Sequence, residues 1–276
     1  MSEMDERLKE QMARFEAARI GDGVALAPAA ITAVLAVFDG TDQDATVRAL
    51  AQAMAARTGA ELRDVRPAAA DALPEILAAA AGCQVVVAPS PFRRDYATEG
   101  QHSLSTTIDL LLAQSDAAVC LARAPVADAD HAVSHPLVAL QIDRHRKAAA
   151  TAMALAFAQN GGELALLSVV DPQQGVHGEE LLGRYLDPHD LSPEVLEGLA
   201  SARAAALTAA LQRNAEQWKV RPLVKFAIGD AVTTALELDR ERQGLLVAGR
   251  ERDARRDEAQ QARRLVLGSR WPVLLV

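Results

Sequence analysis

The feature that most constrains this chain is an apolar run that ends in an acidic turn, in the sequence ITAVLAVFDGTDQDA at residues 31–45. Largely apolar residues lead up to Asp39, Gly40 and Thr41, and the spacing then becomes helical. A run without polar alternation is typical of a strand buried on both faces, as in a parallel sheet. Ligands of such sheets bind outside the carboxyl ends of the strands. This turn is therefore the first candidate position for a functional site.

The same pattern returns in HPLVALQIDRHRKAAA at residues 135–150, where Asp143 takes the place of Asp39. The two copies are about a hundred residues apart, which is too long for a solenoid repeat and suits a duplicated domain. Around them, apolar runs of strand length alternate with segments of helical spacing. Strict alternation predicts parallel sheets between helices, with right-handed crossovers. We therefore expect an α/β protein of two tandem domains, each with a mostly parallel sheet of its own between helices.

Periodicity and composition divide the chain into four parts. They are an amphipathic helix at 1–22, a first domain at 30–123, a linker at 124–135 and a second domain at 136–276. The second domain has one strand and one long helix more than the first, so the first copy is trimmed. The apolar stripe of the N-terminal helix must be buried. Either this helix lies across its own domain, or it is a dimerisation or partner helix.

Composition excludes several classes of partner. Aromatic residues make up 3% of the chain and the net charge is −8. So few aromatic rings offer little surface for bases to stack on, and an acidic chain offers no basic patch for phosphates, so nucleic acid is not expected as a partner. No apolar run is long enough to span a membrane, and the N-terminus is charged rather than signal-like, so we expect a cytoplasmic protein without a membrane partner. Cys83 and Cys120 lie in apolar runs and are expected to be buried, reduced thiols.

The order of elements resembles the universal stress protein family, here as a tandem pair in one chain. LAVFDGTDQDATVRALAQAMAARTGAEL is similar to the family's opening strand, acidic turn and first helix. GDAVTTALELDRERQGLLVAGR is similar to its third helix and fourth strand, and RWPVLLV to its closing strand. The resemblance implies a Rossmann-like (adenine nucleotide alpha hydrolase-like) fold and a pseudo-dimer within the chain, paired through the last strands. Many members bind ATP or a related nucleotide, and others do not.

Members that bind nucleotide carry Gly-x2-Gly-x9-Gly-Ser/Thr after the fourth strand. The glycines let the backbone approach phosphates, and the final pair presents N–H groups and a hydroxyl at a helix N-terminus. In the second domain Gly249 matches, but Arg252 replaces the second glycine and Ala259-Gln260 stand near the final pair. Acidic residues on the same loop would repel a triphosphate. We therefore interpret Asp143 and Gly249 as vestiges of a lost site.

The first domain keeps more of a binding pattern, although Ala88 and Pro89 stand where the motif begins. Ser105-Thr106 fall at the final pair of the motif, close behind two arginines on the same loop. The nucleotide-binding candidates are Asp39, Gly40, Thr41, Ser103, Ser105 and Thr106. Two structural alternatives remain open. Ser103 or Ser105 caps the following helix, and Asp39 bonds the amides of its own turn.

The sequence carries no pattern of catalysis. It has neither a G-x-S-x-G elbow nor a Walker A sequence, and no metal site is predicted. We therefore expect a non-catalytic protein that acts in the stress response through contacts with a protein partner, without ATP, with a homodimer as a further arrangement. The alternative is a sensor that binds ATP or AMP in the first domain only. Slow ATP hydrolysis, a third class, lacks residues for a metal and an ordered water.

Overall fold

The computed structural model describes residues 25–100, 102–140, 147–171, 192–250 and 256–276. The predicted helix at 1–22 and Asp143 lie outside these ranges. Within them, no helix combines the length and the hydropathy needed to cross a membrane.

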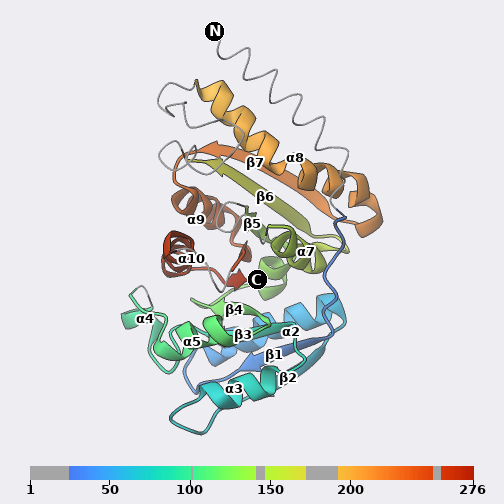
Figure 1. The fold of residues 1–276 in the computed structure, drawn as a ribbon. Coiled ribbons are helices and arrows are strands. Elements are labelled where there is room, and N and C mark those ends of the chain that lie inside the picture. The colour runs from blue at the N-terminus through green and yellow to red at the C-terminus, as the bar shows by residue number, and fades with distance from the viewer. Residues whose placement is uncertain (1–24, 101, 141–146, 172–191, 251–255) are drawn as a thin grey trace.

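One sheet runs through the described part of the chain, in the order β2-β1-β3-β4-β9-β8-β5-β6-β7 (Figure 1). The first half contributes β1 (Ala33–Val37), β2 (Glu61–Val65), β3 (Val85–Pro89) and β4 (Ala118–Ala122). The second half contributes β5 (Leu137–Ala139), β6 (Glu163–Val170), β7 (Arg221–Ile228), β8 (Leu246–Ala248) and β9 (Val273–Leu275). Neighbouring strands are parallel within each half, and β4 and β9 are antiparallel.

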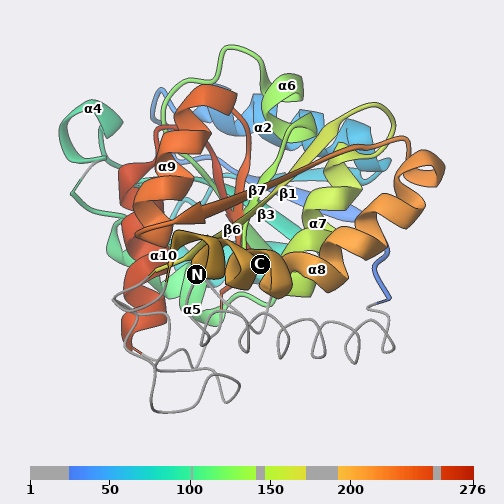
Figure 2. The same cartoon turned by 90° about the horizontal axis from the view of Figure 1, so that it is seen from above.

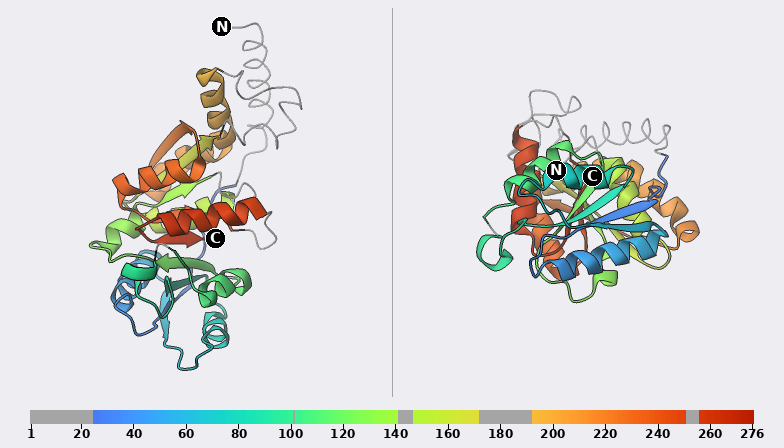
Figure 3. Two further views of the ribbon diagram at one scale, coloured as in Figure 1. Left: turned by 90° about the vertical axis from the view of Figure 1, so that its left-hand side faces the viewer. Right: turned by 90° about the horizontal axis from the view of Figure 1, so that it is seen from below.

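Helices cover both faces of the sheet (Figure 3). One face is covered by α2 (Asp44–Thr58), α6 (Ala129–Ser134), α7 (Lys147–Ala158) and α8 (Pro193–Trp218). The other is covered by α3 (Leu73–Ala80), α5 (Thr106–Gln114), α9 (Ala231–Arg242) and α10 (Arg256–Gly268). The single-turn helix α4 (Tyr96–Glu99) lies in the connection after β3. The predicted alternation of strands and helices is thus confirmed.

The number of sheets differs from the expectation of one sheet per domain. The last strands of the two halves, β4 and β9, lie edge to edge, so backbone hydrogen bonding continues from one half into the other. A single sheet alone would count against a duplication, but the strand order repeats. Outward from the junction, the first half reads β4-β3-β1-β2 and the second reads β9-β8-β5-β6, with β7 added at its edge. The additional strand β7 and helix α8 are the elements that the trimmed first half was predicted to lack.

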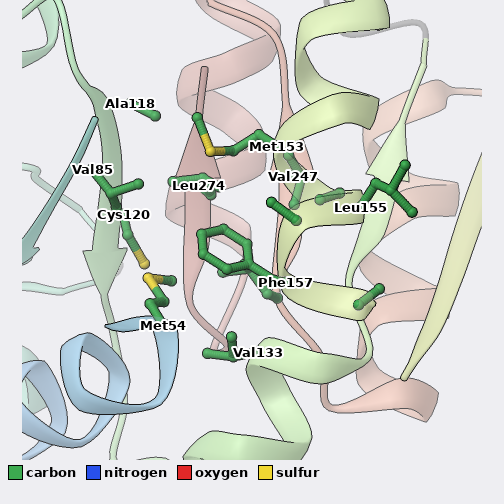
Figure 4. Packing of buried hydrophobic residues seen from close by; sticks show 14 of the residues in the cluster. Met54, Val85, Ala118, Cys120, Val133, Met153, Leu155, Phe157, Val247 and Leu274 are labelled. Carbon is green, nitrogen blue, oxygen red and sulfur yellow. The ribbon is translucent and has the colours of Figure 1, made fainter. Parts of the chain in front are cut away.

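The two halves also share a hydrophobic core around the junction (Figure 4). Cys120 of β4 stands opposite Leu274 of β9, and both are fully buried. Met54 of α2 and Phe157 of α7 belong to the same cluster. Cys83 is also buried, both thiols are free as predicted, and burial raises the pKa of the Cys120 thiol. Because the cluster draws on both halves, we expect them to unfold together.

Residues 124–135 are not the structureless linker that their composition predicts. They contain α6, whose first turn is capped by the Asp128 carboxylate and whose Val133 is fully buried. Asp130 of α6 forms an ion pair with Arg57 of α2 at 2.8 Å, which holds the connection against the first half. A helix of this length is too short to show a helical period in the sequence.

Candidate functional site

The first-domain candidate residues gather at the carboxyl ends of β1 and β3. Asp39 follows β1, and Ser105 directly precedes α5. The loop after β3 lies between them, because the backbone N–H of Arg93 donates to the Asp39 carboxylate and that of Phe92 donates to the Ser105 hydroxyl at 3.3 Å. These contacts bring the turn at Asp39 and the start of α5 at Ser105 together, with the loop at Phe92 and Arg93 between them.

The Asp39 carboxylate is already bonded within the protein. Its Oδ1 accepts hydrogen bonds from the Thr41 backbone N–H at 2.9 Å and from the Thr41 hydroxyl at 2.6 Å. Its Oδ2 accepts from the backbone N–H of Arg93. The turn-bonding alternative for Asp39 is confirmed, and the bond to Arg93 adds a long-range contact that the local pattern did not indicate.

A second carboxylate occupies the remaining amides of the turn. Asp44, in the first turn of α2, accepts from the backbone N–H of Asp39 at 2.9 Å and from that of Gly40 at 3.2 Å. It also forms an ion pair with Arg66 at 2.8 Å. Gly40 has a φ of +88°, a left-handed conformation that favours glycine. Amides in such a turn, at a helix start, can hold an anion, and here the chain's own carboxylate takes that place.

Of the two arginines of the loop, Arg94 forms an ion pair with Glu99, and Arg93 is directed to backbone carbonyls. The Arg93 guanidinium donates to the carbonyl oxygen of Pro67 at 2.6 Å, of Ala69 at 2.8 Å and of Ala70 at 3.2 Å. These contacts fix the β3 loop to the connection between β2 and α3. A phosphate at the turn would have to compete with them for the Arg93 charge.

Ser105 caps α5. Its hydroxyl accepts from the backbone N–H of Ile108 at 3.4 Å, and its own N–H donates to the Ser103 hydroxyl at 3.1 Å. Thr106, the first residue of the helix, is exposed. The capping alternative is therefore confirmed for Ser105, and Ser103 supports the cap from outside the helix.

A buried amide lies behind the turn. Gln43 is 4% exposed, and its Nε2 donates to the carbonyl oxygens of Ser90, Ala122 and Arg123 at 3.1, 3.3 and 2.7 Å. Its Oε1 is buried and has no hydrogen-bond partner within the described ranges. Gln43 therefore joins the ends of β3 and β4 beneath the candidate site.

Arg123, which follows β4, is fully buried. Its guanidinium donates to the carbonyl oxygens of Ser90 and Gly100 in the first half and of Leu267 and Ser269 in the second. No carboxylate of the described residues forms an ion pair with it, and burial lowers the pKa of the guanidinium from its ordinary value. Leu267 lies at the carboxyl end of α10, where the helix dipole favours a cation.

The strand end in the second half also carries an arginine that donates to backbone carbonyls of the opposite half. Gly249, the matching glycine of the motif, is buried directly after β8. The guanidinium of the next residue, Arg250, donates to the carbonyl oxygens of Leu112, Ser115 and Ala117 at the end of α5. Arg123 and Arg250 therefore play matching parts, each reaching the carboxyl end of a helix in the opposite half.

No group of three or more His, Cys, Asp or Glu side chains suited to a metal ion occurs in the part of the chain that the structure describes. Around the first-domain turn, the carboxylates of Asp39 and Asp44 accept hydrogen bonds from the backbone N–H groups of Asp39, Gly40, Thr41 and Arg93.

Comparison with known proteins supports the fold. No family model and no curated protein matches the chain. A solved universal stress protein from Archaeoglobus fulgidus is 13% identical, with a TM-score of 0.57 over 88% of this chain and 95% of that chain. A solved putative universal stress protein from Pseudomonas aeruginosa is 13% identical, with a TM-score of 0.51 over 90% of this chain and 93% of that chain. The chain therefore has the Rossmann-like fold of universal stress proteins.

Proposed function

We propose that this chain is a tandem universal stress protein with a degenerate nucleotide motif, acting in the cytoplasm as a non-catalytic regulatory or interaction protein. Its role in the stress response would depend on contacts with a protein partner and not on ATP. The fold shared with solved universal stress proteins supports the family, and the repeated strand order supports the tandem form.

The observation that carries the proposal is the bonding of the turn after β1. The N–H groups of Asp39 and Gly40 donate to the Asp44 carboxylate, and that of Thr41 donates to the Asp39 carboxylate. A phosphate placed at these amides would have to displace two carboxylates that carry its own sign of charge. Like charges at such distances repel, and the amides cannot serve both groups at once.

The test is isothermal titration of the full chain with ATP and with AMP, each with and without magnesium. We expect no saturable heat up to millimolar nucleotide, and no nucleotide released on denaturation as measured by mass spectrometry. We also expect that partners retained without crosslinking on the immobilised protein, from lysates of stressed cells, stay bound when nucleotides are removed with apyrase, because the contact does not depend on them.

Two matched variants make the titration decisive. Asp39→Ala removes the carboxylate in the first half, and Asp143→Ala removes its sequence counterpart in the second. Saturable heat in the wild-type protein that vanishes in Asp39→Ala and survives in Asp143→Ala would replace our proposal by the alternative, an ATP or AMP sensor in the first domain.

A further inference from the structure

The strand β7 forms one outer edge of the sheet. Seen from above, it is the strand nearest the viewer, with α8 on one side and α9 on the other (Figure 2). In the described part of the chain it pairs with β6 only. Of its side chains, Phe226 is 43% exposed and Ile228 is 37% exposed, which is high for large apolar residues. An exposed apolar edge of this kind is a template for pairing with another strand.

The backbone groups that point outward follow from the pairing with β6. The Arg221 N–H donates to Gly162 and the Gly229 N–H to Val170, so the odd-numbered residues of this stretch face β6. Because backbone direction alternates along a strand, the N–H and C=O groups of Val224, Phe226 and Ile228 point away from the sheet. Pro222 also occupies an outward position, where a residue without an N–H does not disturb the pairing with β6.

The opposite edge of the sheet, β2, is protected by charge. Its one exposed large apolar side chain, Leu62 at 40%, lies among the exposed charged residues Glu61, Arg63 and Asp64, and Glu61 pairs with Arg63 at 2.7 Å. Charged side chains are a usual protection of edge strands against pairing. In β7 the charged residues are Arg221, at its start, and Lys225, and the stretch from Phe226 to Ile228 carries none. The two edges therefore differ in their fitness for a partner strand.

We propose that β7 pairs antiparallel with β7 of a second copy of this chain, about a twofold axis at Phe226. In this register Phe226 faces the partner subunit's Phe226, and Val224 faces the partner subunit's Ile228. Each of these outward-pointing pairs exchanges both of its backbone hydrogen bonds. The sheet is already joined antiparallel once, at β4 and β9, so this dimer extends one twisted sheet through two chains.

The residues of β7 favour this register over those with the axis at Lys225 or at Val224. An axis at Lys225 would bring two like charges face to face, which is destabilising. An axis at Val224 would set Pro222 opposite the partner subunit's Phe226, and this pair would lack one hydrogen bond because proline has no N–H. With the axis at Phe226, Lys225 faces the partner subunit's Ala227, and the two exposed aromatic rings meet across the strands. The strand can thus pair with itself without a like-charge contact or a lost donor, which favours a second copy as its partner. This inference does not depend on the proposed function.

The test begins with analytical ultracentrifugation of the full-length protein, which we expect to be a dimer. Phe226→Pro removes the outward N–H on the axis from each chain without touching the bonds to β6. Two lost hydrogen bonds are expected to weaken the dimer about a hundredfold. Leu62→Pro is the matched control. Because the Glu61 N–H donates to the carbonyl oxygen of Thr32, directly before β1, the backbone N–H of Leu62 points away from the sheet, and the substitution removes an outward N–H from the opposite edge. It should leave the dimer unchanged.

A charge exchange separates lost pairing from lost folding. Phe226→Lys and Phe226→Glu each place like charges on the axis, and each variant should be monomeric alone. Mixed in equal amounts, they should form a dimer of one chain of each kind. A monomeric wild-type protein, a dimer that survives Phe226→Pro, or a mixture that stays monomeric would overturn the proposal.

Discussion

Replacing Arg123 by methionine is expected to lower the free energy of unfolding by about 3–5 kcal/mol, because several buried carbonyl groups lose their donor together. Methionine keeps much of the apolar stem, so the loss reports the removal of the guanidinium and not of the whole side chain. The acceptors belong to Ser90 and Gly100 in one half and to Leu267 and Ser269 in the other. The effect should therefore appear in a single unfolding transition of the whole protein.

Urea unfolding followed by circular dichroism measures this loss. Arg270→Met is the matched control, since Arg270 lies on the same α10–β9 connection and is exposed, and it should change stability by less than about 0.5 kcal/mol. Arg123→Lys should recover only part of the stability, because an ammonium cannot reproduce the planar set of donors. A loss below about 1 kcal/mol in Arg123→Met would show that water replaces the guanidinium.

Replacing Asp239 by asparagine is expected to stabilise the protein at pH 8 and to have little effect at pH 4. Asp239 on α9 is 1% exposed. Its Oδ2 accepts from the Ser269 hydroxyl at 2.8 Å, and its Oδ1 has no partner among the described residues. Burial raises the pKa of this carboxyl from 3.8 to about 7, although the Ser269 hydroxyl and the Arg242 charge act in the opposite direction.

The sign of the effect follows from proton binding. Because the folded state holds the Asp239 proton more tightly than the unfolded chain does, this residue makes stability fall as pH rises from about 4 to about 7. Above that range its effect is constant. The difference in pKa sets an upper limit of about 4 kcal/mol.

Thermal and urea unfolding of both proteins at pH 4, 6 and 8 measure this dependence. Asp64→Asn, on the exposed edge strand β2, controls for the loss of an exposed carboxylate. If the Asp239→Asn variant followed the pH dependence of the wild-type protein, the buried carboxyl would not be the cause.

The order of the elements could be predicted from the sequence because strands and helices leave local signals. The run before Asp39 is apolar without interruption, and Gly59 ends α2 in a left-handed conformation as its position indicates. The joining of the two sheets was only implied by the family resemblance, since no local pattern marks which strand edges meet. The short helix α6 in residues 124–135 was missed for lack of length.

The candidate site was predicted in part for the same reason. Asp39, Thr41 and Ser105 follow strand ends or precede a helix, so the sequence located them. Asp44 was missed although an acid in the first turn of a helix is a signal for bonding to nearby amides. Arg123 was missed because its partners come from distant segments. Ser269 is 146 residues away, and a single arginine after a strand is usually read as a surface residue.

The position of the junction determines where this architecture can change. Because β4 and β9 meet in the middle of the sheet, β2 and β7 lie at the rims, as far as possible from the shared core. A strand at the rim, such as β7 with its helix α8, pairs with only one other strand. Its loss therefore interrupts no pairing between the remaining strands, and the first half can lack this unit while the second half has it. The two halves are therefore free to diverge from the outside inward, with the centre of the molecule as the part that both must preserve.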